Sequence, residues 1–291
     1  MFKICDRFAL LNQQLTRCIF LCTAGRVIAK IGTSGLNVKG LTLVGGLLYG
    51  LLERSEYQLA VFSDNDYRSL GMLNLPGLCT ANRNADMISC VRYSRFYACV
   101  GGGSSVHVFD LDGRALSMWS VQGTPCGLSV IPGSGNLLVT CKYPSCKLVE
   151  LNVDNGEKVH EIILPPDIEG LKHAVKLTTG EYVVGFVDDL YGLCTVDGKG
   201  KVTRTFDDSQ GELTLYPSYL AVDEDTQFIF VADYWNHQVA LFSPTLEFAR
   251  VVVGGVPWPD RLYLDQTKHR LYVGVNDVHR EHYSGVVVCQ F

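Results

Sequence analysis

The segment FIFVADYWNHQVALFS, residues 228–243, places a polar and aromatic cluster between two apolar runs. Its centre, DYWNH at residues 233–237, contains the residue types from which acid–base or ligand-binding sites are built. Asp, Asn and His also serve in tight turns, because their short polar side chains hydrogen bond to nearby backbone groups. The two interpretations make different predictions. A turn should recur with the strands that it joins, whereas a reactive cluster should occur once.

Other residues have the chemistry of a metal site or a nucleophile. His279 and His282 lie three residues apart around Glu281, but in a loop rather than on a helix that would place both on one face. The GGGSSV segment at residues 101–106 lacks the GxSxG elbow that activates a serine. Loop acids are usually solvated, so no catalytic residue, metal or cofactor is assigned. Ca²⁺ and Mg²⁺ bind oxygen ligands. If the loops that carry them converge, the residues that could supply these ligands are Asp188, Asp189, Asp233, Asn276 and Asp277.

The charge balance argues against binding that is driven by phosphate contacts. The chain has 291 residues, with 25 Lys and Arg against 30 Asp and Glu, for a formal net charge of −5. The basic residues are scattered rather than clustered. A DNA-binding protein or a protein that binds an anionic membrane would normally carry a basic patch, so neither partner is expected.

The cysteines indicate a reducing compartment. There are eleven, an odd number, and most lie within apolar runs such as FYACV and LLVTC. In such runs cysteine behaves as a small buried hydrophobe, and the spacings lack the CxxC pairs of a zinc site. The N-terminus has no long apolar core of the kind found in a secretory signal. We therefore expect a cytoplasmic protein with reduced, mostly buried cysteines.

The apolar runs recur at a regular spacing. Their starts are separated by 41 to 49 residues, the range typical of four-stranded propeller blades. Each repeat has a strand before the run and a strand after it, followed by a turn rich in Asp, Asn and Gly, which favours a hairpin. The runs are apolar at nearly every position, as expected for strands that are covered on both faces. They begin at Leu47, Phe96, Leu137, Tyr182, Phe228 and Leu271.

The ends of the chain indicate how the repeats close. The last repeat contains only three strands. RVIAKIG at residues 26–32 resembles ARVVVGG at residues 249–255, the fourth strand of the preceding repeat, and could supply the missing strand. We predict an all-β fold, a six-bladed β-propeller of four-stranded antiparallel blades whose last blade is closed by an N-terminal strand. Closure would cover the edges that otherwise promote aggregation. Residues 1–291 are expected to form one propeller domain, with residues 1–14 as an N-terminal extension. The only helix candidate, around residues 8–15, begins within that extension.

One repeat resembles a known family. Residues 216–248, YPSYLAVDEDTQFIFVADYWNHQVALFSPTLEF, are similar to an NHL repeat, with the Val-Asp, Val-Ala-Asp and Asn-His positions in place. The arginine that usually follows Asn-His is Gln238 here, so its salt bridge to Asp233 cannot form. The resemblance implies that Asp233, Asn236 and His237 are turn residues. It extends to the C-terminal propellers of tripartite-motif (TRIM-NHL) proteins, which act as recognition modules.

The resemblance implies a non-enzymatic recognition module, such as the substrate-recognition part of a ubiquitin-ligase-type protein. We expect a protein partner at the rim formed by the loops between second and third strands and between consecutive blades. Aromatic and basic residues on these loops have the composition of an interaction surface. The predicted binding residues are Arg54, Tyr57, Arg83, Lys142, Tyr143, Tyr191, Tyr234, Trp235, Trp258, Arg280 and Tyr283.

Two alternatives are kept. NHL-type propellers also bind single-stranded RNA, but the loops assigned to this rim carry five basic against seven acidic residues, which weakens the phosphate contribution. Propellers of the gluconolactonase and strictosidine-synthase types hold carboxylates near a central channel, often around a metal. This second likeness implies a metal-dependent lactonase or esterase that would use Asp189 or Asn276.

Overall fold

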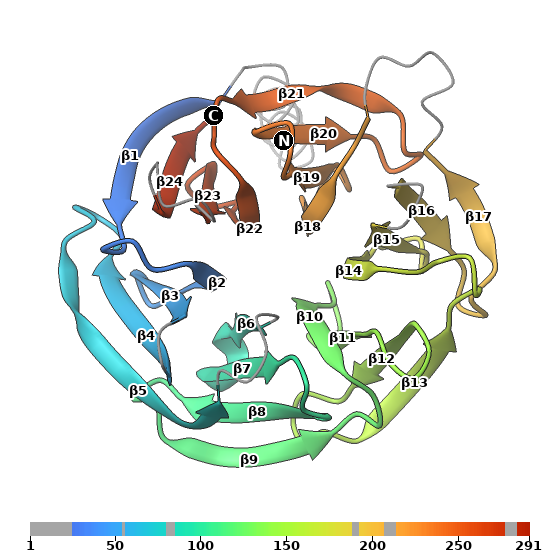
Figure 1. Ribbon diagram of the computed structural model, residues 1–291, viewed down its shortest axis with the longest axis horizontal. Helices are drawn as coiled ribbons and strands as arrows, with labels where there is room; N and C mark the ends of the chain where they lie inside the picture. The colour runs from blue at the N-terminus through green and yellow to red at the C-terminus, as the bar shows by residue number, and fades with distance from the viewer. Residues whose placement is uncertain (1–24, 54–55, 80–84, 188–191, 207–213, 277–283) are drawn as a thin grey trace, which may run out of the picture.

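The fold is a six-bladed β-propeller, as predicted. The computed structural model describes residues 25–53, 56–79, 85–187, 192–206, 214–276 and 284–291. Within these ranges it contains six sheets of four antiparallel strands, arranged around a central axis (Figure 1). The one helical element described is a single 3₁₀ turn, η1 (Val91–Tyr93). None of the described helices is long and apolar enough to cross a membrane.

The innermost strand of each blade lines the axis. These strands are short and mostly buried, and each begins immediately after the connection from the preceding blade. They are the elements that position the candidate site described below. In chain order they are β2 (Val38–Val44), β6 (Ala85–Cys90), β10 (Pro125–Val130), β14 (Leu171–Lys176), β18 (Pro217–Val222) and β22 (Pro259–Asp265).

The second strands are the apolar runs of the sequence, and their starts agree with the predicted starts to within one residue. Alternate side chains face opposite neighbouring blades: Leu51 packs toward Phe96 of the next blade, whereas Leu52 packs toward Tyr272 of the last. Burial on both faces explains why the interior positions of these strands are nearly all apolar. These strands are β3 (Leu47–Glu53), β7 (Arg95–Val100), β11 (Leu137–Cys141), β15 (Tyr182–Phe186), β19 (Ile229–Asp233) and β23 (Arg270–Val275).

The third strands are also largely buried and continue the packing outward. The hydrophobic core consists of six clusters, each formed between two adjacent blades. The core is therefore a ring rather than a single centre, as stacked sheets require. The third strands are β4 (Glu56–Ser63), β8 (Ser105–Asp110), β12 (Lys147–Leu151), β16 (Gly192–Val196), β20 (Gln238–Phe242) and β24 (Gly285–Gln290).

The outer strands are more exposed, and one of them comes from the other end of the chain. β1 (Arg26–Gly32) pairs antiparallel with β24, from Arg26 opposite Gln290 to Gly32 opposite Gly285. The predicted closure is thus confirmed, and Figure 1 shows β1 beside β24. The other outer strands are β5 (Ser69–Cys79), β9 (Ala115–Ser120), β13 (Lys158–Ile163), β17 (Val202–Thr205) and β21 (Phe248–Gly254).

Candidate functional site

A β-bulge recurs near the start of the innermost strand in five of the six blades. In β2 the register passes from Val38 to Gly40, which leaves Lys39 unpaired in the ladder. A bulge re-aims one side chain relative to the regular alternation. Here it directs the extra residue of each strand to one mouth of the central channel. The bulged residues are Lys39, Cys126, Lys172, Ser218 and Asp260.

Glycine follows the bulge in two blades because the neighbouring strand lies too close for a side chain. A Cβ added at Gly40 would lie 2.6 Å from the Met87 backbone nitrogen. At Gly127 it would lie 2.8 Å from the imidazole of His173. The absent side chains let the innermost strands approach one another around the axis.

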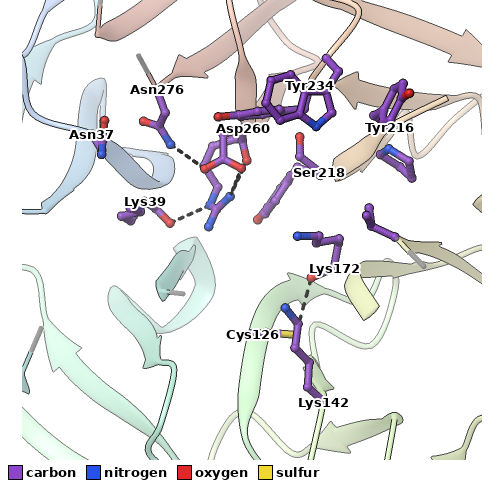
Figure 2. A pocket seen from close by; sticks show the side chains of 15 residues that line it. Asn37, Lys39, Cys126, Lys142, Lys172, Tyr216, Ser218, Tyr234, Asp260 and Asn276 are labelled. Carbon is purple, nitrogen blue, oxygen red and sulfur yellow. Dashed lines mark hydrogen bonds and ion pairs between the residues drawn. The ribbon is translucent and has the colours of Figure 1, made fainter. Parts of the chain in front are cut away.

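The mouth is a cavity of about 300 Å³. Figure 2 shows Lys142 and Lys172 on one side of it and Tyr234, Asp260 and Asn276 on the other. The bulged residues supply part of the lining, and loops on the same face supply the rest. These loop and flanking residues include Asn37, Lys142, Val187, Tyr216, Tyr234, Trp235 and Asn276.

A buried polar network centred on Asp86 closes the channel below the mouth. The Asp86 carboxylate accepts hydrogen bonds from the backbone amides of Met87 and Leu128, each at 2.8 Å, and from the Tyr219 hydroxyl at 3.1 Å. Arg261 Nε lies 3.6 Å from the same carboxylate. Burial raises the pKa of Asp86 to about 7, and Arg261 and the amide donors oppose that rise.

His173 belongs to the same network and is held neutral. Its Nε2 lies 3.0 Å from the Leu128 carbonyl, and its Nδ1 accepts a hydrogen bond from the Leu220 amide at 3.4 Å. The imidazole therefore carries its proton on Nε2. The ring also stacks on Tyr219 with centroids 3.7 Å apart. Burial lowers the pKa of His173 to about 3, so the ring has neither a free nitrogen nor a charge to offer a substrate.

The cations at the mouth fall into two groups. Lys39 pairs with Glu53 at 3.4 Å, and Arg261 pairs with Asp260 at 3.0 Å. Lys142 and Lys172 have no carboxylate within 4.0 Å among the residues that the structure describes. Burial lowers the pKa of Lys172, the charge of Lys142 lowers it further, and Asp260 raises it. The mouth therefore carries positive charge that the described residues do not neutralise.

The DYWNH segment forms the turn between β19 and β20 and supplies the aromatic side of the mouth. The Asp233 carboxylate accepts hydrogen bonds from the Tyr216 amide and from the side chains of Asn236 and Gln238, at 2.8 to 2.9 Å. His237 has a φ of 55° and accepts a hydrogen bond from the Trp258 amide at 3.1 Å. The turn interpretation is therefore confirmed, and Gln238 takes the place of the arginine as a neutral donor.

The two aromatic residues of this turn also line the mouth. Tyr234 and Trp235 contact each other edge to face, with ring centroids 5.1 Å apart. Trp235 is 52% exposed. The turn geometry does not require a ring at either position, so both can contact a ligand at the mouth.

Three of the predicted binding residues, Lys142, Tyr234 and Trp235, lie together at the mouth. Tyr143, which is 67% exposed, lies beside Lys142 and lines a second cavity of about 570 Å³. The predictions for Arg54, Arg83, Tyr191, Arg280 and Tyr283 fall outside the described residues.

Two predicted contact residues are wrong. Tyr57 is 1% exposed and packs in the cluster between the first two blades, because its position in β4 faces the neighbouring sheet. Trp258 is 8% exposed, with its ring edge to face on His237 at 5.0 Å. The connection between blades that carries Trp258 packs back onto the preceding blade, so the ring is not available at the rim.

The candidate metal ligands do not form a site within the described residues. Asn276 holds β2, since its Oδ1 accepts a hydrogen bond from the Val38 amide at 2.6 Å and its Nδ2 donates to the Val38 carbonyl at 3.0 Å. No cluster of three or more His, Cys, Asp or Glu suited to a metal occurs in the described part of the chain. Asp188, Asp189, Asp277, His279 and His282 lie outside it.

The one thiol at the mouth is not a nucleophile. Cys126 is buried, its Sγ lies 3.4 Å from the Thr140 carbonyl, and burial raises its pKa to about 12. A reactive cysteine needs its thiolate, which a lowered pKa would supply. Cys126 is thus a protonated, hydrogen-bonded part of the wall.

Sequence reasoning missed the lysine and arginine residues that come from strands rather than loops, namely Lys39, Lys172 and Arg261. A signal for them exists. All six innermost strands have a polar or small residue at the second position, within VKGL, ADMI, PCGL, LKHA, PSYL and PDRL. Five of them are bulged there, whereas Asp86 of ADMI stays in register and is buried. A residue of that kind near the start of a buried strand indicates a bulge, because regular alternation would bury it.

Comparisons with known proteins identify the fold. No family model matches the chain, and no curated protein sequence matches it. Among solved structures, the WD40 repeats of RRP9 are 12% identical with a TM-score of 0.65, over 92% of this chain and 97% of that one. A Bacteroides caccae protein of unknown function is 16% identical with a TM-score of 0.65, over 83% and 88%. A Kuenenia stuttgartiensis hydrazine synthase is 12% identical with a TM-score of 0.61, over 91% and 98%.

Proposed function

We propose that this propeller is a non-catalytic recognition module that binds a segment of a protein partner at the channel mouth. One observation carries the proposal: two lysines with no acid within 4.0 Å in the described part of the chain line a single cavity on the loop face together with Tyr234 and the exposed ring of Trp235. Aromatic residues beside cations are the composition found at the centres of protein interfaces. The WD40 repeats among the fold neighbours agree with such a role, although the hydrazine synthase shows that the fold alone does not select it.

The polar groups below the mouth support recognition over catalysis. The nitrogens of His173 and the oxygens of Asp86 are all engaged within the protein. The Cys126 thiol is held protonated. A general base or nucleophile needs an available atom within reach of the substrate, and these groups do not offer one.

The NHL resemblance motivates a finer version of the proposal. Propellers of tripartite-motif proteins select the substrate of a ubiquitin ligase, and the NHL-like turn of this chain places Tyr234 and Trp235 at the mouth. We propose that this chain, too, selects a protein for a larger assembly, within the cytoplasm.

The proposal is tested by affinity capture from cells that express the tagged chain. The Tyr234→Ala, Trp235→Ala double variant removes both rings of the turn, and Phe248→Ala on the outer strand β21 removes an aromatic that is 42% exposed, against 52% for Trp235, from the same blade. We expect a protein that the wild-type chain and Phe248→Ala retain and the double variant loses, with at least a tenfold weaker affinity once the partner is purified.

Other results would overturn the proposal. Equal capture by all three proteins would place the binding surface elsewhere. Capture of RNA, with an affinity that falls steeply as salt rises, would replace the protein partner by a nucleic acid. Ester or lactone turnover that persists in the double variant would replace recognition by catalysis.

A further inference from the structure

Lys142 and Lys172 differ from the other partly buried lysines of this protein. Elsewhere a lysine with little side-chain exposure is paired: Lys147 with Glu161 at 3.1 Å and Lys176 with Glu150 at 2.5 Å are examples. Lys142 and Lys172 are also partly buried, yet neither is within 4.0 Å of an acid in the described residues. Lys39, also at the mouth, is paired with Glu53, so Lys142 and Lys172 differ even from their neighbour in the part of the chain that the structure describes.

The two unpaired lysines come from adjacent blades and act on each other. Lys142 directly follows β11, and Lys172 is the bulged residue of β14. The charge of Lys142 contributes to the lowered pKa of Lys172, after burial. Figure 2 shows both side chains at the same side of the mouth, near Cys126. Two like charges held close together, with no counter-ion among the described residues, are unfavourable unless a bound anion neutralises them.

The other described groups of the mouth offer the two lysines no free carboxylate. The Asp260 carboxylate is engaged by Arg261 at 3.0 Å and by the Asn276 amide at 2.5 Å. The Ser218 hydroxyl donates to the Pro259 carbonyl at 2.7 Å, and the Cys126 thiol is neutral. The amino groups of Lys142 and Lys172 are thus cationic donors that remain for a ligand among the described residues of the mouth.

We propose that Lys142 and Lys172 form an oxyanion subsite that binds a carboxylate or a phosphate monoester on the partner's bound segment. The inference rests on the proposed function and specifies its anchor. A cavity of about 300 Å³ accommodates one side chain rather than a folded surface. The anion enters between the two ammonium groups, while the flanking part of the segment contacts Tyr234 and Trp235. Charge-assisted hydrogen bonds of this kind are short and strong.

The subsite is tested with small anions on the purified full chain, independently of any partner. Inorganic phosphate and succinate are titrated at low ionic strength by calorimetry, against wild type, Lys142→Met, Lys172→Met and Lys199→Met. Lys199 is an exposed lysine on the β16–β17 turn, away from the mouth, and serves as the control. We expect one anion to bind wild type and Lys199→Met equally, and either mouth variant to bind at least tenfold more weakly.

Further variants make the result specific. Lys142→Arg and Lys172→Arg keep the charge and should restore most of the affinity. The methionine variants should fold at least as well as wild type, because each removes an unpaired charge, and thermal unfolding checks this. Preference for phosphate indicates a phosphorylated segment, and preference for succinate indicates an acidic one.

The outcomes for the subsite and for the proposed function are separable. Equal binding of both anions by all four proteins, or no binding by wild type, overturns the subsite even if capture of a partner depends on Trp235. Anion binding that requires both lysines, together with capture that ignores Tyr234 and Trp235, upholds the subsite and overturns the proposed mode of recognition.

Discussion

At the scale of single residues, polar groups at the axis have hydrogen-bond partners within the protein, whereas two lysines at the mouth have no acid partner among the described residues. Asp86, His173 and Tyr219 are buried, and each is hydrogen bonded to backbone or side-chain partners in other blades. Buried polar groups are costly unless they are satisfied in this manner. The amino groups of Lys142 and Lys172 at the mouth lack such partners among the described residues. Satisfied groups stabilise the fold, whereas unsatisfied charges at a cavity are suited to a ligand.

The first prediction concerns the pH dependence of stability at His173. Its folded pKa of about 3 lies below the ordinary value of 6.5, so its contribution is complete above pH 6.5 and is lost as the pH falls toward 3. The free energy of unfolding should therefore decline below pH 6.5 by up to about 1.4 kcal/mol per pH unit from this residue. Guanidinium unfolding between pH 7 and 4 should show a shallower decline in His173→Gln.

A control separates this effect from other titrating groups. Asp86 acts in the opposite direction, because its raised pKa favours the folded state as the pH falls below about 7. The comparison of wild type with His173→Gln removes that shared contribution. His160→Gln changes an exposed histidine on β13 and should leave the slope unchanged. Identical slopes in wild type and His173→Gln would show that His173 titrates normally in the folded protein.

The residues that the sequence could place are those whose role is local. Asp233, Asn236 and His237 were predictable as turn residues because their partners are close in the chain or in the adjoining connection. Tyr57 and Trp258 were misplaced because their burial depends on the neighbouring blade. The charge of the mouth was also hidden, since Lys172 and Arg261 lie within strands and become neighbours of the loops only through the bulges.

At the scale of elements, the strand ladder was predictable and its irregularities were not. A run of nearly all apolar residues marks a strand that is buried on both faces. The second strands could therefore be located to within a residue. A bulge leaves a weaker trace, a polar residue at the second position of a short strand. Those bulges create the site, because a regular β14 would turn Lys172 away from the channel.

The closing strand gives the prediction at this scale. Deleting residues 1–31 removes all of β1 except Gly32 and exposes the ladder edge of β24. Ile31 alone is 5% exposed and packs between the first and last blades, and losing such a side chain costs roughly 2–5 kcal/mol. We expect a thermal midpoint lower by at least about 5 °C and aggregation at the new edge.

Deletion of residues 1–24 is the matched control, because it leaves β1 intact. Differential scanning calorimetry and light scattering compare the two truncated chains. If both unfold at the same temperature and stay equally monodisperse, β1 does not contribute the closure that its pairing indicates.

At the scale of the whole molecule, the axis joins all six blades through one polar network. Arg261 of β22 donates hydrogen bonds to the carbonyls of Lys39 in β2 and Ala85 in β6, each at 2.7 Å. Asp86 in β6 binds the Leu128 amide of β10 and the Tyr219 hydroxyl of β18. His173 of β14 completes the ring through the Leu128 carbonyl. The network supports the floor of the mouth and couples blades that do not touch through their sheets.

The last prediction tests that coupling through Arg261. Arg261→Met leaves the Asp86 carboxylate buried without its cation, which typically costs about 3–5 kcal/mol. The loss should exceed that in Arg204→Met, whose partly exposed pair with Glu181 at 3.2 Å contributes under about 1 kcal/mol.

Without Arg261 the folded pKa of Asp86 rises above about 7, so the variant should lose stability as the pH rises from 5 to 8, more steeply than wild type. Adding Asp86→Asn removes the titrating group and should abolish that slope. Urea unfolding of the four proteins at pH 5 and 8 measures these differences. A pH-independent cost in Arg261→Met, unchanged by Asp86→Asn, would mean that the two residues are not coupled and that the blades are held by their apolar interfaces alone.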